Sequence, residues 1–494
     1  MEIVSVKPLL ALLISAAASV LILFSGKRPN LREFWTVTAA LVKTALVLSL
    51  YPWIRSGHTV VWKLGEIFPD TGMFLRVDAL GFTFAAVASA LWILTSVYSI
   101  GYMRSLKEKD QTRYFFSFAL SLSATLGIAF AGDLLTFFIF FEILAVVTYP
   151  LVTHKQTDEA IKAGRKYLVY SLSAGGLLLL AILWTYHATG NLNFTPGGFL
   201  SGLKDSRMIF IIFFLFIYGC GVKAALFPLH AWLPSAMVAP TPVSALLHAV
   251  AVVKAGVFGI LRITGFVFGP SVLKETGLGD ALGMIAGFTI LGASFMALAQ
   301  ENLKRRLAYS TISQLSYIIL GSALASQTAY TGAVLHLGNH AMMKIALFFA
   351  AGAIYCRTHC ENISDLKGLG YRMPFTFTAF TIGAVGLSGF PLFSGFISKW
   401  MLCMGAIDSH HGAALAIYLS SALLNLLYLL PIVIIGFSRS AKHEAVEEKP
   451  WTLWVPPIIA AAAVLAFGSV PAWIQIQKGL ADLAAASVFM GGMP

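Results

Sequence analysis

The chain has 494 residues, of which 58% are hydrophobic and only 11% are charged, and its formal net charge is +12 at pH 7. This composition excludes an ordinary soluble domain, in which about a quarter of the residues are charged, and predicts an all-α polytopic membrane protein. The positive charge does not indicate a nucleic-acid partner, because the Lys and Arg residues lie in short segments between apolar stretches and form no single basic face.

Apolar windows long enough to cross a bilayer recur from one end of the chain to the other. They predict about fourteen transmembrane helices in a single membrane domain, residues 1–494, without a cleavable signal peptide. The predicted spans are residues 4–25, 35–54, 80–103, 114–131, 133–153, 166–187, 208–228, 241–265, 279–299, 308–325, 329–355, 374–400, 412–437 and 452–471.

The basic residues of the loops are unevenly divided between the two sides of the predicted membrane. Of the 34 Lys and Arg residues, 20 lie in odd-numbered loops, 9 lie in even-numbered loops or the tails, and 5 lie within spans. The positive-inside rule therefore predicts a cell inner (cytoplasmic) membrane protein with both termini outside. The nine residues assigned to the outer side are Lys7, Arg55, Lys63, Arg76, Lys204, Arg207, Arg262, Lys274 and Lys478.

Two predicted spans contain helix-breaking residues. The seventh includes GCGVKAALFPLHAWLP and the twelfth includes GLSGFPLFSGFISK. Gly and Pro at this density remove helical hydrogen bonds, and freed backbone at membrane depth is tolerated only where it is buried or lines a cavity. Because the two broken helices are five spans apart, they predict two inverted five-helix repeats, residues 114–265 and 279–437.

Several spans carry ionisable residues near their middle, where a charge costs a few kcal/mol or more and usually faces a bundle interior or a route for ions. In the eleventh span the spacing i, i+4, i+8 places three titratable groups along one stripe about 12 Å long. These residues predict a chain of proton-transfer groups. Its candidate members are Glu142, Lys223, His248, Lys254, His336, His340, Lys344 and Lys399.

Some of these residues also fit a structural role. Glu142 is too deep in its span to cap the helix, but a fixed ion pair with a lysine is an alternative to a switch in which its distance sets the charge of Lys223. His248 fits a helix-packing hydrogen bond as well as a relay. Asp133 follows Gly132 at the start of its span and is expected to be an N-cap. Lys43 has no evident partner, which favours a structural or subunit-contact role.

Five stretches resemble the signature segments of a known family, the proton-translocating antiporter-like subunits of respiratory complex I and of Mrp-type cation/proton antiporters. They occur in the family's order across spans three to thirteen, and the first looks closer to the D subunits of Mrp antiporters and to membrane-bound hydrogenase subunits. The stretches are GDLLTFFIFFEIL, GVKAALFPLHAWLPSAMVAPTPVSALLHAVAVVKAG, KRRLAYSTISQLSYI, HLGNHAMMKIALFF and GLSGFPLFSGFISKW.

The resemblance implies fourteen helices with inverted repeats and broken helices seven and twelve. It implies that Glu142 and Lys223 form a switching pair and that Lys254 is the connecting lysine of helix eight. It further implies that Lys399 is the terminal lysine of helix twelve, and that the stripe of the eleventh span is the central polar axis.

The leading functional hypothesis is a proton-translocating subunit of a redox-driven complex, such as an NADH:quinone oxidoreductase-like or hydrogenase-like complex. The alternatives are a subunit of a secondary Na⁺/H⁺ antiporter and a scaffold that no longer conducts. We expect no cofactor and no metal in this chain: there is no GxGxxG motif, and the near-pair in CRTHC has no second pair to complete a site. The expected partners are other membrane subunits, H⁺, Na⁺ within the complex, and lipid.

Overall fold

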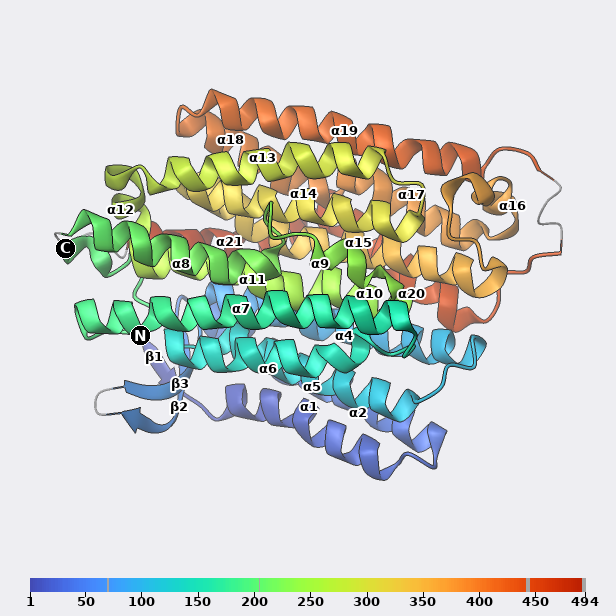
Figure 1. The fold of residues 1–494 in the computed structure, drawn as a ribbon, viewed down its shortest axis with the longest axis horizontal. Helices are drawn as coiled ribbons and strands as arrows, with labels where there is room; N and C mark the ends of the chain where they lie inside the picture. Colours follow the sequence, from blue (N-terminus) through green and yellow to red (C-terminus); the bar gives the residue numbers. More distant parts are fainter. Residues whose placement is uncertain (69–70, 204, 441–444, 491–494) are drawn as a thin grey trace.

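The computed structural model describes residues 1–68, 71–203, 205–440 and 445–490, so Lys204 and Lys442 of the topology prediction lie outside the described residues. Long helices lie side by side, with both termini at one end of the bundle and α16 at the other (Figure 1). The helices are α1 (Lys7–Phe24), α2 (Pro29–Leu48), α3 (Tyr51–Arg55), α4 (Ala79–Ser105), α5 (Gln111–Phe130), α6 (Leu134–Val152), α7 (Asp158–Thr189), α8 (Ser206–Ala224), α9 (Trp232–Ser235), α10 (Thr241–Ala245), α11 (Val252–Arg262), α12 (Gly269–Thr276), α13 (Leu278–Leu298), α14 (Leu303–Ala323), α15 (Gln327–Thr358), α16 (Leu369–Arg372), α17 (Pro374–Ser388), α18 (Ser394–Asp408), α19 (Gly412–Gly436), α20 (Trp451–Ser469) and α21 (Pro471–Met490).

The predicted all-α membrane class is confirmed. Among the described residues, 12 helices are long and apolar enough to cross a membrane. The two expected spans outside this set are the tenth and the twelfth. The tenth corresponds to α14, which carries three consecutive basic residues and several hydroxyl and amide side chains but is largely enclosed by other helices. The twelfth is divided into the short helices α17 and α18.

A small three-stranded sheet is present that the sequence analysis does not predict. Strand β1 (Glu2–Val4) pairs in parallel with β2 (Thr59–Phe68), which pairs antiparallel with β3 (Thr71–Val77). From sequence, the segment between the second and third spans reads as a loop because it is short and contains charged residues. The strands lie at the end of the bundle that also holds the termini (Figure 1).

Both predicted helix breaks are present. Helix α8 ends at Ala224, followed by Ala225 at φ 58°, and α17 ends before Gly389 at φ 90°. A third interruption is not predicted: between the π-helical turn Leu246–Val250 and α11, Ala251 adopts φ −112° and ψ −82°. No Gly or Pro lies at this break, so it cannot be predicted from the residue types at this position.

Helix α21 follows the fourteenth span and is likewise not predicted. It packs against α15 and α4, with the small residues Ala481, Ala484 and Ala485 buried at the contact. Its Asp482 accepts a hydrogen bond from Thr331 Oγ1 at 3.2 Å. Because its composition is only moderately apolar, α21 reads from sequence as a polar tail.

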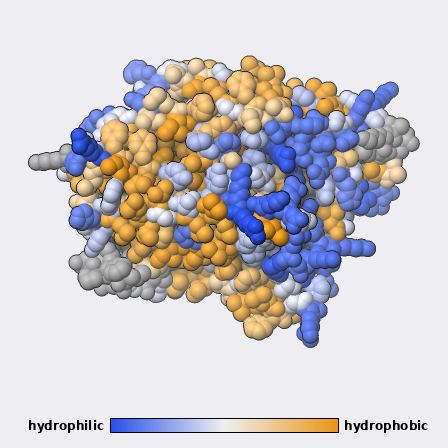
Figure 2. Space-filling view, in the orientation of Figure 1, coloured by the Kyte–Doolittle hydropathy of each residue, from blue (hydrophilic) through white to orange (hydrophobic). Residues whose placement is uncertain are grey.

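The distribution of apolar and polar residues on the surface is the one expected of a protein that spans a bilayer. Figure 2 shows an apolar belt across the exposed face and hydrophilic residues gathered toward the end where α16 lies. The most apolar windows of the segment Thr241–Thr276 and of α15 are 100% buried inside the protein, whereas those of the outer helices α1 and α2 are 39% buried. Polar side chains within these two windows are therefore enclosed by protein.

Arg262 does not lie in an outer loop, as the topology count assumes, but is the last residue of α11 and is buried. Its guanidinium forms a bidentate ion pair with Asp78, including Nη2 to Oδ1 at 2.8 Å. Burial raises the pKa of Asp78, but the charge and hydrogen bonds of Arg262 outweigh burial, so the net pKa lies below its ordinary value. The pair ties the start of α4 to the end of α11.

We predict that Asp78→Asn lowers the free energy of unfolding by about 3 kcal/mol, because it leaves a buried guanidinium without its counter-charge while the N-cap of α4 is kept. Equilibrium unfolding in mixed micelles measures this loss. Glu447→Gln, which breaks the exposed Lys449–Glu447 pair, is the matched control and should not change stability measurably. Equal effects of the two variants would contradict the prediction.

Candidate functional site

Seven of the eight residues predicted to transfer protons are buried, and Glu142 is partly exposed. Lys223, Lys254 and Lys344 are each no more than 1% exposed, and Lys399 is 7% exposed. The two central segments supply most of the titratable groups, and α8 and α18, which border the predicted breaks, supply one lysine each. The fold therefore removes these side chains from lipid without placing them at a water-facing surface.

Lys223 lies in the last turn of α8, immediately before the break. Its ammonium donates a hydrogen bond to the backbone carbonyl of Phe141 on α6 and lies 3.4 Å from the centroid of the Phe141 ring. Gly256 of α11 permits this arrangement, because a Cβ there would stand 2.3 Å from the backbone nitrogen of Ala224. The close contact between α11 and α8 holds the lysine against α6.

Glu142, the predicted partner of Lys223, directly follows Phe141. Its carboxylate faces Gly175 of α7, where a Cβ would lie 2.5 Å from the carboxyl carbon, and Oε1 has no hydrogen-bond partner among the described residues. The structure brings Glu142 and Lys223 to adjacent positions, but no ion pair joins them. In this conformation Glu142 and Lys223 therefore do not form a fixed structural ion pair.

A row of contacting polar groups begins at Lys254. Its ammonium lies 2.9 Å from His340 Nδ1 and donates to the carbonyl of Leu337 at 2.9 Å. The rings of His340 and His336 are 5.8 Å apart, and His336 Nδ1 lies 2.8 Å from Ser398 Oγ on α18. We call Lys254, His340, His336, Ser398 and Lys399 the central row.

Lys399 closes this row on the side of α18. Its ammonium donates to the carbonyl of Leu387, in the last turn of α17, at 2.6 Å. It also lies 5.0 Å from the ring of Tyr317, which stacks on His336 at 5.7 Å. The break between α17 and α18 thus supplies both the lysine and its acceptor, because carbonyls of a terminal helical turn lack intrahelical partners.

Two predicted members lie beside the central row and make no hydrogen bond to it. Lys344 donates to Ser310 Oγ and to the carbonyl of Leu307 on α14, the latter at 3.0 Å. His248 packs against Phe348 with ring centroids 4.8 Å apart, and neither of its nitrogens has a partner among the described residues. The three-residue stripe of α15 is therefore divided among three neighbouring helices: His336 contacts α18, His340 contacts α11 and Lys344 contacts α14.

Several polar residues of the site are not predicted from sequence. Ser398, Ser310 and Tyr317 contact the titratable groups directly, and Gly175 makes room for Glu142. A serine in an apolar helix usually bonds a carbonyl of its own preceding turn, so its sequence carries no sign of a second partner. Asp133, in contrast, is the expected N-cap, and accepts from the backbone nitrogen of Thr136 at 2.7 Å.

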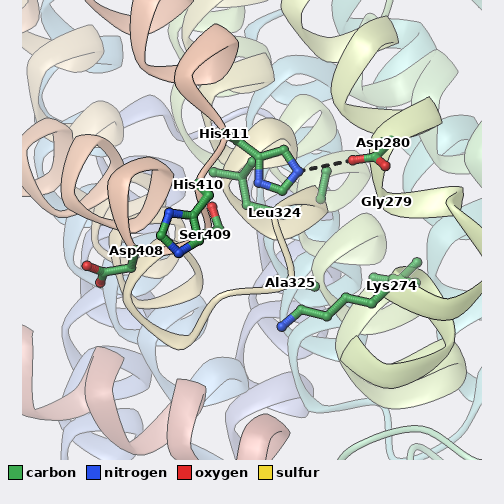
Figure 3. Close-up of a pocket in the computed structure, with 11 residues that line it drawn as sticks. Lys274, Gly279, Asp280, Leu324, Ala325, Asp408, Ser409, His410 and His411 are labelled. Atoms are coloured by element: carbon green, nitrogen blue, oxygen red, sulfur yellow. Dashed lines mark hydrogen bonds and ion pairs between the residues drawn. The ribbon is translucent and has the colours of Figure 1, made fainter.

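A surface hollow of about 370 Å³ lies apart from this buried site. Figure 3 shows Lys274 and Asp280 on one side of the hollow, with Asp408 and His410 on the other and His411 directed toward Asp280 at 3.1 Å. The side chains of that ion pair are 41% and 70% exposed. This exposed ion pair differs from the central row, whose side chains are buried.

Comparison with known proteins shows which family this chain resembles. Residues 131–425 match the family model described as NADH:quinone oxidoreductase/Mrp antiporter, TM. The chain belongs to this family. It is 31% identical to NADH-quinone oxidoreductase subunit N of Desulforudis audaxviator, over 86% of this chain and 84% of that protein.

Two further relatives come from different complexes. The chain is 30% identical to the D subunit of the Na(+)/H(+) antiporter of Alkalihalophilus pseudofirmus, over 94% of both proteins. It also superposes on a chain of the membrane-bound sulfane sulfur reductase, an archaeal respiratory membrane complex, with a TM-score of 0.87 and 26% identity over 98% of this chain and 100% of that chain. The resemblance drawn from the five sequence stretches is confirmed.

We predict that Gly175→Ala lowers ion transport about tenfold, because the new methyl group must displace the Glu142 carboxylate, and overpacking of this kind costs about 1–3 kcal/mol. Transport by the assembled complex is the measurement. Gly176→Ala is the matched control: nothing lies within 4 Å of a Cβ at that position. Equal rates for the two variants would show that the position of Glu142 does not matter.

Proposed function

We propose that this antiporter-like subunit translocates protons along the central row. The observation that carries the proposal is the unbroken set of buried side-chain contacts from Lys254 through His340 and His336 to Ser398, beside Lys399. Among the described residues the Nε2 atoms of both histidines have no partner, which leaves each imidazole a second site for proton exchange.

We further propose that Glu142 and Lys223 act at one end of this route. The Lys223 ammonium is held by a carbonyl and an aromatic face, both neutral, next to the residue that carries the carboxylate. A movement of one side chain would form or break the ion pair, and the presence of the counter-charge decides whether a buried lysine keeps its proton. His248 and Lys344, on the same two central segments, would supply further exchange groups.

The proposed driving force is electron transfer in other subunits of a respiratory complex. The relative named NADH-quinone oxidoreductase subunit N and the structural similarity to a chain of an archaeal respiratory membrane complex support this choice. Flavin, iron–sulfur and quinone chemistry would then belong to those other chains, and this chain would hold no cofactor.

A secondary Na⁺/H⁺ antiporter is the second candidate, because the related D subunit of a Na(+)/H(+) antiporter matches over nearly the whole of both chains. A lysine ammonium cannot coordinate Na⁺, whereas it can release a proton and the resulting neutral amine can accept one. This chain would therefore move H⁺ in either complex, and a different subunit would handle Na⁺.

The experiment compares proton uptake by inverted membrane vesicles under two drives. If electron transfer drives the complex, an electron donor should acidify the vesicle interior. If the complex is a Na⁺/H⁺ antiporter, added Na⁺ should collapse a preformed proton gradient. We predict that Lys344→Met and Lys399→Met each reduce the active signal at least about tenfold, with assembly checked separately, since a thioether cannot carry a proton. Parental rates in both variants would refute proton translocation through the row.

We also propose that both termini face the periplasmic side, from the excess of basic residues in the odd-numbered loops. We predict that Lys109→Cys is labelled by an impermeant thiol reagent only from the cytoplasm and Lys274→Cys only from outside, in a variant without the four native cysteines. Both positions are exposed and lie in predicted loops of opposite parity. Labelling of Lys109→Cys from outside would invert the topology.

A further inference from the structure

Lys43 is the one membrane lysine that the proposed route does not use. It lies in α2 and is 0% exposed, so it is not a contact for another subunit. Its ammonium donates to the Leu122 carbonyl of α5 at 3.0 Å and to Ser15 Oγ of α1 at 3.3 Å, and lies 4.7 Å from the Trp92 ring of α4. All of these partners are neutral.

Helix α4 separates Lys43 from the central row. One face of α4 meets α15 at Val87, which touches Gly338, and at Tyr98, whose hydroxyl donates to the Phe349 carbonyl at 2.8 Å. Ser96 is nine residues from Val87, which places it about 180° away around the helix. Lys43 and the central row therefore lie on opposite sides of one helix.

The face of α4 toward α2 carries a polar stripe. Ser89, Trp92 and Ser96 have helical spacing along it, and all are buried. The Oγ atoms of both serines and Nε1 of Trp92 have no hydrogen-bond partner among the described residues. Buried polar atoms are nearly always satisfied, so these three atoms indicate a hydrated seam instead of a packed protein core.

The stripe continues from Lys43 toward the end of the bundle with the basic loops. Ser99 Oγ and Tyr114 OH are 2.8 Å apart and follow Ser96 in that direction. On α2, Thr36 lies on the same face as Lys43. Glu33, also buried, is ten residues from Lys43, about 15 Å along the helix and about 80° around it. A buried carboxylate thus stands at the surface end of the seam and a buried ammonium at its inner end.

Arg104 holds the carboxylate at the surface end. Its guanidinium forms a bidentate ion pair with Glu33, with Nε to Oε1 at 2.9 Å, while half of the Arg104 side chain is exposed. Arg32 lies 3.8 Å from the same carboxylate and bonds Gln111 of α5 at 2.8 Å. This cluster of charged side chains closes the surface end of the seam.

We propose that the seam between α2, α4 and α5 is a water-lined half-channel that delivers protons from the basic-loop face, past Glu33, to Lys43. The inference rests on the proposed function, because a half-channel has a use only if the chain moves protons. A purely structural ammonium would account for the Ser15 and Leu122 contacts, but it would not account for three unpaired polar atoms along the seam.

The first test needs no transport. Thr36→Cys and Ser96→Cys, in a cysteine-free background, should react with a small hydrophilic thiosulfonate from the basic-loop side at least tenfold faster than Leu41→Cys. Leu41 is 51% exposed on the outside of α2, where it faces lipid, and a thiol there lacks the water needed to form a thiolate. Equal, slow reaction at all three positions would show a dry seam and overturn the proposal.

The second test measures proton transport. Lys43→Met and Lys43→Arg should each lower transport at least tenfold, since neither side chain releases a proton, and Leu41→Met should retain the parental rate. Parental transport in Lys43→Met together with loss in Lys344→Met would refute the half-channel alone. Parental transport in both would refute the proposed function itself. If the Lys43 variants do not assemble, the thiol reactivity of Ser96→Cys decides.

Discussion

A lysine inside a bilayer must find hydrogen-bond acceptors, and in this protein each of the five membrane lysines finds a backbone carbonyl. The acceptors belong to Phe141, Leu122, Leu337, Leu307 and Leu387. Among the described residues, no carboxylate forms an ion pair with any of them. A carbonyl accepts a hydrogen bond from the ammonium and also from the neutral amine, and it holds the charged form less firmly than a carboxylate would, which suits the proposed gain and loss of protons.

This arrangement requires close packing between the helices that carry the lysines and their neighbours. A second hydrogen bond to a helical carbonyl requires a neighbouring helix to approach closely, and glycines such as Gly256 permit that approach. The surrounding apolar helices exclude both lipid headgroups and bulk water from the central row. The low dielectric of the interior makes an unpaired charge costly. For the same reason, a change of hydrogen-bond or ion-pair partner there strongly shifts the protonation equilibrium of a lysine.

The sequence predicts the class, the order of the spans, two of the three breaks and the presence of eight titratable residues within spans. Charged residues and Gly/Pro clusters within apolar windows can be recognised from the sequence alone. It does not predict the contacts among them. The division of the α15 stripe, with Lys344 facing α14 and His336 facing α18, depends on which helices pack on either side. Ala251 and the bridging serines also have ordinary side chains, so only tertiary structure gives them a role.

The interruptions in the route coincide with the interruptions in the helices. Contacts are continuous from Lys254 to Lys399, but Lys223 bonds α6 and makes no hydrogen bond to Lys254, and His248 bonds neither. Non-helical backbone lies at these gaps, after Lys223 at Ala225 and between His248 and Lys254 at Ala251. Segments without a helical ladder change conformation at lower cost than helix interiors. If the proposed route operates, these gaps are the positions at which it would open and close, beside the continuous contacts of the central row.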